Sequence, residues 1–195
     1  FGNQPNVLHW NLAVFADTLI PAISNDEKKS IKIIREKLDN FSLLFSNNWY
    51  DMMYKKLGIL KPIEKDKILV DSLLELMDSY KADYTNTFAA LSLNVNLDNS
   101  LFKSSKFRKW SEEWKSRINS NDSIKSFKLM KQQNPSIIPR NHLVELALEK
   151  SIIGKFNLLN NLLNLVSKPY DYTSNYNFQT IPEGFDDSYK TFCGT

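Results

Sequence analysis

The chain has 195 residues, of which 42% are hydrophobic, 12% aromatic and 24% charged, and its net charge is +3. This length and composition fit one ordinary domain, or one and a half lobes of a larger one, with a hydrophobic core, and they argue against disorder along the whole chain. The net charge is too weak to indicate a partner, and the single cysteine, Cys193, excludes an internal disulfide. Two histidines and one cysteine cannot build a Cys/His zinc site.

The five glycines and seven prolines are few for this length, which favours long helices over a turn-rich β architecture. No apolar run approaches ~18 residues, so the sequence predicts no transmembrane helix. No charged start followed by an apolar stretch is present, and we therefore expect a protein that is not secreted. Because the first residue is Phe1 and not methionine, we expect that the chain was processed or cut from something longer.

The first predicted helix, residues 6–20, is apolar on nearly every face and is expected to end at Pro21. A helix that is apolar all round belongs in the middle of a domain. We therefore expect Leu12 and Phe15 to be buried.

A second helix is predicted to begin near Asp26, whose side chain can cap it, and to carry an apolar stripe from Ile31 to Phe45. The stripe can continue as far as Gly58, which has the position of a C-terminal cap glycine. After a loop at Pro62, apolar and aromatic residues at helical spacing predict the next helix. These residues are Leu69, Leu73, Leu76 and Tyr80.

Helix starts and polar loops alternate in the second half of the chain, beginning with Asp83 as a capping residue. From Tyr170 to Thr195 there is no helical period, and we expect an extended tail on the surface. The helices predicted between these points cover approximately residues 84–93, 105–118, 122–133, 140–153 and 156–166, with a polar loop at 94–100.

The segment from Lys103 to Lys131 holds nine basic residues against three acidic ones, so it carries +6 and the remainder −3. With two tryptophans, it has the composition of a nucleic-acid surface. The alternative is that Trp110 and Trp114 belong to a core stripe, because stacking on bases requires exposed aromatic side chains. We favour the core and expect no nucleic-acid partner. On this interpretation Lys109, Glu113 and Arg117 form a solvated face whose charges pair with one another.

The sequence lacks the patterns that hold phosphates or metals. Its glycines are far apart, so neither a P-loop nor a dinucleotide-binding fingerprint is present, and the metal-binding runs of kinases are absent. Cys193, His142 and Asn141 are the residue types of a thiol protease, but nothing fixes their geometry, and His142 is better explained as a polar residue at a helix start. We therefore assign no catalytic, cofactor-binding or metal-binding residue to this chain.

Several short strings in order along the whole chain resemble the selenoprotein O family, also known as the YdiU family of protein adenylyltransferases. Any one string is weak, but together they are fairly specific. The strings are Gly2-Asn3-Gln4-Pro5 with Trp10-Asn11-Leu12-Ala13, Ala82-Asp83-Tyr84-Thr85-Asn86-Thr87-Phe88, the pair Trp110 and Trp114, Asn134-Pro135 with Pro139-Arg140-Asn141-His142-Leu143-Val144-Glu145, Lys168-Pro169-Tyr170, and Thr191-Phe192-Cys193-Gly194-Thr195.

The resemblance implies a protein-kinase-like fold that transfers AMP from ATP to hydroxyl side chains of proteins. In such a fold this chain is similar to the helical C-lobe with its C-terminal extension. We therefore expect an all-α bundle over residues 1–169 and an extended tail over residues 170–195. The family's ATP-binding, catalytic and metal-binding residues lie before the segment that this chain resembles. ATP and Mg (or Mn) are thus cofactors expected of the parent protein, and none is expected in this chain.

The resemblance also implies a redox-regulatory role for Cys193. Family members end in a selenocysteine or cysteine that is thought to pair with another cysteine and restrain activity when oxidised. The alternative is an idle surface thiol, and the pairing cysteine has no counterpart in this chain. The family is compatible with the bacterial cytoplasm or the mitochondrion.

We therefore expect the C-terminal, regulatory and scaffolding part of a protein adenylyltransferase, inactive alone. Its expected partners are the N-terminal catalytic portion of the same protein and the parent's protein substrates, with no membrane partner. The exposed surface of an excised lobe could also support a homodimer. The alternative function is an autonomous helical protein-interaction module without enzymatic activity, which exposure of Trp110 or Trp114 would favour.

Overall fold

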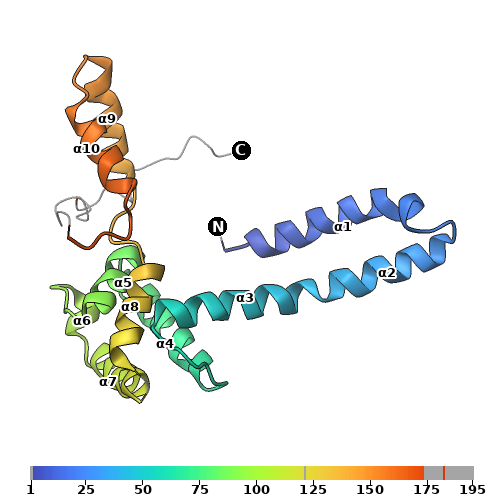
Figure 1. Ribbon diagram of the computed structural model, residues 1–195, viewed down its shortest axis with the longest axis horizontal. Helices are drawn as coiled ribbons and strands as arrows, with labels where there is room; N and C mark the ends of the chain where they lie inside the picture. The colour runs from blue at the N-terminus through green and yellow to red at the C-terminus, as the bar shows by residue number, and fades with distance from the viewer. Residues whose placement is uncertain (1, 121, 174–181, 183–195) are drawn as a thin grey trace. The chain divides into compact units, whose positions relative to one another are not determined.

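The computed structural model describes residues 2–120, 122–173 and 182 (Figure 1). All the elements that it describes are helices and none is a strand, which confirms the all-α prediction. In chain order they are α1 (Gln4–Ile23), α2 (Glu27–Asp39), α3 (Phe41–Lys56), α4 (Asp66–Ser79), α5 (Tyr84–Leu93), α6 (Ser100–Lys103), α7 (Ser105–Asn119), α8 (Ser123–Gln133), α9 (Asn141–Ile152) and α10 (Asn157–Val166).

The chain divides into two compact units, residues 1–53 and residues 54–195, and each is described by itself. In the first unit α1 lies against α2, and the ring of His9 stacks on the ring of Phe41, with 5.2 Å between their centroids. The unit contains little else that could cover α1.

The prediction that the first helix is buried is wrong for this chain. No residue of α1 is buried, and Leu12 and Phe15 are 37% and 59% exposed. The physical reason is that a helix with apolar residues on every side needs neighbours on every side, whereas α2 covers only one. Its other faces keep their apolar side chains exposed.

The predicted end of this helix at Pro21 is also wrong, because α1 continues through Pro21 to Ile23. A proline removes one backbone donor and crowds the turn before it. Here only one helix hydrogen bond is lost, close to the C-terminal end, and the helix ends two residues later.

The second unit has its core where α4 packs against α7 and α5 packs against α8. The predicted stripe on α7 is confirmed as core, since Trp110 and Trp114 are buried together with Phe107 and Ile118. Both indoles are also satisfied: Trp110 Nε1 donates to the Leu69 carbonyl at 2.8 Å, and Trp114 Nε1 donates to the Leu57 carbonyl at 2.9 Å.

Local capping chemistry fixes most helix ends near their predicted positions. The side chains of Asp26, Asp83, Ser104 and Asp122 each accept a hydrogen bond from a backbone N–H in the first turn of the following helix. At the end of α3, Gly58 has φ +71, its N–H donates to the Lys55 carbonyl, and the N–H of the next residue donates to the Tyr54 carbonyl. This pair of bonds is the Schellman ending predicted for a cap glycine. The short helix α6 was not predicted.

Helices α9 and α10 form a hairpin that stands away from the body formed by α4–α8 (Figure 1), and we call it the arm. The two helices pack on each other and turn at Gly154, which has φ +77. Within the two helices only Ala147 and Leu162 are buried. The arm therefore has a thin core and a large exposed surface.

None of the described helices is long and apolar enough to cross a membrane.

Candidate functional site

The arm is joined to the body by a charged contact between two distant parts of the sequence. Arg140, the residue before α9, lies against Asp83 and Asn86 at the start of α5. Its Nη1 donates to Asp83 Oδ2 at 2.6 Å, and its Nη2 donates to Asp83 Oδ1 and Asn86 Oδ1, each at 3.0 Å. The guanidinium is buried, so this paired, planar contact fixes direction as well as position.

Asp83 also caps the helix that follows it. Its Oδ1 also accepts a hydrogen bond from the Asn86 N–H at 2.6 Å and so caps α5. One carboxylate therefore both starts α5 and receives Arg140. Its oxygens are already occupied by these contacts, which makes Asp83 a poor candidate for a catalytic base.

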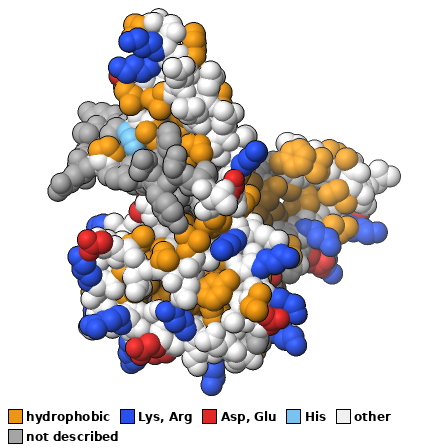
Figure 2. Space-filling view, turned by 60° about the vertical axis from the view of Figure 1, so that its left-hand side comes forward, with side chains coloured by type: hydrophobic (Ala, Val, Ile, Leu, Met, Phe, Trp, Pro, Cys, Tyr) orange, Lys and Arg blue, Asp and Glu red, His pale blue; other side chains and the backbone are white. Residues whose placement is uncertain are grey.

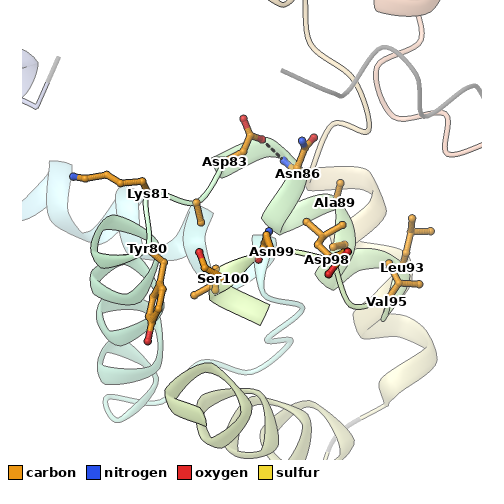
Figure 3. A pocket seen from close by; sticks show the side chains of 14 residues that line it. Tyr80, Lys81, Asp83, Asn86, Ala89, Leu93, Val95, Asp98, Asn99 and Ser100 are labelled. Carbon is orange, nitrogen blue, oxygen red and sulfur yellow. Dashed lines mark hydrogen bonds between the residues drawn. The ribbon is translucent and has the colours of Figure 1, made fainter. Parts of the chain in front are cut away.

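A cavity of about 600 Å³ lies beside this contact. Figure 3 shows Asp83 and Asn86 on one side of it, joined by their hydrogen bond, and Tyr80 on another. The buried side chains of Ala89, Ala90 and Leu101 also line it. Apolar lining with a polar rim suits binding more than chemistry.

The polar groups around this cavity are largely used within the fold. Asn99 caps α6 by accepting from the Phe102 N–H at 3.0 Å, and Asp98 pairs with Lys103. The hydrogen bond from Lys103 lowers the pKa of the Asp98 carboxyl. Ser100 lines the cavity together with Asp83 and Asp98, but these carboxylates are engaged by Arg140, the start of α5 and Lys103, so the arrangement is not that of a catalytic pair.

A second cluster is centred on Asn134, at the end of α8, whose side chain is fully buried. Its Nδ2 donates to the Lys56 carbonyl at 2.8 Å and to Ser92 Oγ at 2.9 Å, and its Oδ1 accepts from Lys56 Nζ at 3.1 Å. Its backbone carbonyl accepts from the Tyr172 hydroxyl at 2.8 Å. A single residue thus ties together α3, α5, α8 and the segment after α10.

Lys56 is the charged member of this cluster. Its ammonium lies 5.4 Å from the ring centroid of Tyr84 and 5.1 Å from that of Phe88. Burial lowers the pKa of the Lys56 ammonium, and burial raises the pKa of the Tyr84 hydroxyl. The lysine is placed as a structural cation held by carbonyl oxygens and aromatic faces.

The segment after α10 is fastened to the linker between α8 and α9. Ser136 donates from its N–H to the Pro169 carbonyl at 2.6 Å and from Oγ to the Asp171 carbonyl at 2.6 Å. Lys131 lies over the ring of Tyr172, 5.8 Å from its centroid. The base of the arm is therefore held on both of its chain segments, the one that enters α9 and the one that leaves α10.

Figure 2 shows basic and acidic side chains interspersed over the visible face of the body. Arg117, which we expected to pair along its own helix, pairs with a carboxylate outside that helix. Its Nε and Nη2 donate to the two carboxylate oxygens of buried Asp66 at 2.8 and 2.9 Å, and Nη2 also donates to the Lys61 carbonyl at 2.6 Å. A buried carboxylate without a cation is costly, whereas the exposed Glu113 is solvated by water. Arg117 therefore pairs with Asp66.

Cys193, the one redox-regulatory residue predicted from the sequence, lies outside the described residues, as does most of the predicted tail. Asn141 is exposed and His142 is half-buried with a contact of its own, so no thiol-protease geometry is assembled from what the structure describes. Among residues 2–120, 122–173 and 182, no group of three or more His, Cys, Asp or Glu side chains could hold a metal ion.

The family model for "Protein adenylyltransferase SelO" matches residues 1–186. Because this match covers most of the chain, the chain belongs to that family. Two of the strings that carried the resemblance, residues 82–88 and residues 139–145, meet in space through Arg140 and Asp83.

Among known proteins, the chain is similar to a "Protein nucleotidyltransferase YdiU" of Clostridium beijerinckii, with 43% identity over all of this chain and 40% of the relative. It is 41% identical to the protein of the same name from Bacillus thuringiensis subsp. konkukian, over all of this chain and 41% of the relative. A Bacillus cereus protein of that name is also 41% identical, with the same coverage. The chain thus spans about two fifths of the length of the curated relatives it matches.

Proposed function

We propose that this chain is a helical, scaffolding and regulatory part of a protein adenylyltransferase that transfers AMP from ATP to protein hydroxyl groups. The family match carries this proposal, together with the chain's span of about two fifths of its relatives. On this proposal the catalytic groups, and the residues for ATP and Mg (or Mn), belong to the rest of the parent protein. The chain alone is then inactive.

The exposed surface of α1 supports the view that further polypeptide is needed to cover it. Large apolar residues on several faces of this helix are exposed, although exposed apolar area of this extent is unusual for a self-sufficient protein. They are Val7, Leu8, Trp10, Leu12, Val14, Phe15, Leu19 and Ile23. We infer that the remaining part of the parent packs on α1, as the C-lobe of a kinase-like fold packs around its central helix.

Transfer of labelled AMP tests the proposal. The chain and its full-length parent are each incubated with ATP labelled at the α-phosphate, Mg²⁺ and a protein extract. Label should enter protein with the full-length parent and remain at the background level with the chain. Transfer by the chain itself, or no transfer by the parent under any metal condition, would contradict the proposal.

The redox role of Cys193 is part of the same proposal and needs its own test. The full-length parent and its Cys193→Ser variant are oxidised, assayed for AMP transfer and then reduced. Oxidation should lower the activity of the wild-type parent reversibly and leave the variant unaffected, because a disulfide requires the thiol. Equal responses of the two proteins would show that Cys193 is an idle thiol.

The alternative of an autonomous interaction module gains no support from the tryptophans. Trp110 and Trp114 are both buried, so they form no exposed groove.

A further inference from the structure

The arm exposes apolar side chains at the end that lies far from the body. Ile152, Ile153 and Phe156 surround the turn at Gly154, and they are 85%, 63% and 51% exposed. Leu148, one turn before them on α9, is also exposed. A solvated helix turn of this kind is normally polar. Several large apolar side chains exposed side by side at one helix turn therefore mark a surface that is covered in another state.

The same end of the arm carries positive charge. A groove of about 430 Å³ is lined by Lys150, Lys155, Phe156 and Leu158, together with Gly154 and Asn157. Figure 2 shows basic side chains beside hydrophobic ones at the top of the view, where the arm ends. Neither lysine forms an ion pair with any residue that the structure describes. Residues 148–158 hold these two lysines against one glutamate, Glu149.

The start of α10 adds to this charge. Its N-cap residue is Phe156, which makes no side-chain hydrogen bond to the helix. The first N–H groups of α10 therefore lack a side-chain cap at the edge of the groove, where the positive end of the helix dipole lies. The helix end is a minor contribution beside the two lysines and the apolar residues, and its sign agrees with theirs.

The arm is also fastened at its base by hydrogen bonds on both chain segments. Arg140 fixes the entry into α9, and Ser136 and Tyr172 fix the exit from α10. A fastened base lowers the entropic cost of binding at the far end, because the surface is already in place.

We propose that the far end of the arm binds a protein segment that carries an apolar side chain next to carboxylates. The apolar side chain lies in the groove against Phe156 and Leu158, and the carboxylates face Lys150 and Lys155. This interaction goes beyond the proposed enzymatic role and does not depend on it.

The number and arrangement of the groups favour a protein over a membrane. A lipid-binding surface collects several basic residues, about four to eight, or a long amphipathic helix. The arm offers two lysines and a groove. The exposed polar side of α10 is neutral and consists of asparagines: Asn157, Asn160, Asn161 and Asn164.

Peptide binding to the whole chain tests the proposal. The probe is a fluorescein-labelled peptide of about twelve residues in which leucine and phenylalanine recur at helical spacing among glutamates. A second peptide has glutamine in place of every glutamate. Fluorescence anisotropy should show saturable binding of the acidic peptide, and binding of the glutamine peptide should be at least about tenfold weaker. Backbone amide shifts in NMR spectra of the chain should change within residues 148–158.

Variants with matched controls test whether the peptide binds at the far end of the arm. The double variant Lys150→Glu/Lys155→Glu and the variant Ile152→Asp should each weaken binding at least about tenfold. Lys128→Glu and Ile124→Asp, on exposed positions of α8, should leave it within about twofold. Ile124 is 81% exposed and so is a close match for Ile152. Circular dichroism checks that every variant is folded.

Several results would overturn the proposal. These are no binding of the acidic peptide at millimolar concentration, equal binding of the two peptides, and equal losses in the arm and control variants. Binding of the chain to phosphatidylglycerol vesicles without binding to the peptide would assign the surface to a membrane. Self-association in light scattering that Ile152→Asp abolishes would assign it to a second copy of the chain.

Discussion

At the scale of single residues, buried polar side chains decide how the second unit is held together. Asn134 and Lys56 show this most clearly, because their side chains join elements that the sequence separates by 78 positions. Each has polar contacts in place of the water it would meet in the unfolded chain. Their contribution lies mainly in leaving no buried group unsatisfied.

Replacement of Asn134 should be costly. We expect Asn134→Ala to lower the free energy of unfolding by about 2–4 kcal/mol, because it removes one buried hydrogen-bond partner each from the Lys56 carbonyl, Lys56 Nζ and Ser92 Oγ. The control is Asn119→Ala, at an exposed position near the end of α7, which should change stability by less than about 0.5 kcal/mol. Urea unfolding followed by circular dichroism measures both. Similar values for the two variants would show that the cluster contributes little.

Lys56 should make stability depend on pH in the alkaline range. Burial places its folded pKa below the ordinary lysine pKa of 10.5, so between these two values the unfolded chain binds a proton that the folded chain does not. The free energy of unfolding therefore rises with pH in that interval. We expect the stability of the wild type relative to Lys56→Met to rise as the pH increases towards about 9.5.

The pH range of this test ends below the ordinary pKa of tyrosine. At higher pH the raised pKa of Tyr84 changes the free energy of unfolding in the opposite direction. The unfolded tyrosine loses its proton first, and stability then falls with pH. Lys115→Met, at an exposed position of α7, is the control, and its difference from the wild type should stay constant. If the stability of the wild type relative to Lys56→Met stayed flat or fell with pH, folding would not disfavour the Lys56 ammonium.

At the scale of elements, helix ends and the joints between helices carry the specificity. The two glycines with positive φ make a natural comparison. An added Cβ at Gly58 would lie 2.9 Å from Met130 Sδ and 3.0 Å from the Ser126 carbonyl oxygen, whereas one at Gly154 would meet nothing within 4 Å. Only the first turn is enclosed by the body.

Gly58→Ala should therefore destabilise the chain by about 2–4 kcal/mol, through both backbone strain and a clash with α8. Gly154→Ala should cost only the strain, about 1 kcal/mol. Thermal unfolding of both variants checks the order. Equal costs would mean that α8 moves aside without penalty.

The joint between the arm and the body is testable through a double-mutant cycle. Arg140→Ala removes the partner of Asp83 and should cost about 2–4 kcal/mol, because both groups are at least partly buried. Asp83→Asn keeps an oxygen that can cap α5 and removes the charge. We expect the pair to show a coupling energy of about 1–3 kcal/mol.

Amide hydrogen exchange gives an independent view of the same joint. Arg140→Ala should speed exchange in the first turn of α9 and leave α7 unchanged. The exposed pair Lys81 and Asp78 provides the matched control, since a cycle there should show no measurable coupling. Additive effects of Arg140→Ala and Asp83→Asn would show that the joint is not energetically coupled.

At the scale of the whole molecule, the apolar surface of α1 is the main feature that the chain itself does not explain. Within its own unit, this helix is covered on one side by α2. If the rest of the parent protein covers α1, truncating the apolar side chains of α1 should lower the free energy of unfolding of the full-length parent. The same truncation should have little effect on the isolated chain.

The double variant Leu12→Ala/Phe15→Ala tests this dependence. In the isolated chain it should cost less than about 1 kcal/mol, because little area is removed from contact. In the full-length parent we expect about 4–8 kcal/mol, the ordinary range for two buried side chains. Unfolding curves of both proteins with and without the double substitution give the comparison. An equally small effect in the parent would place α1 on its surface.

The sequence by itself determined most of the helix ends and the core face of α7, although not the end of α1 or the short helix α6. Capping residues such as Asp83 and Asp122, the glycine at 58 and the stripe of Trp110 and Trp114 predicted helix ends and a core face, because each depends on neighbours within a few positions. The ordered strings predicted the family for a similar reason, since they are read directly along the chain.

Only the tertiary structure decided which polar groups meet. No local pattern brings Arg140 to Asp83, Arg117 to Asp66 or Lys56 to Asn134, because these contacts depend on how helices pack across intervals of 51 to 78 positions. The exposure of α1 was decided in the same way. Apolar periodicity predicts that a helix face will be covered, but it cannot say whether the covering surface lies in the same chain.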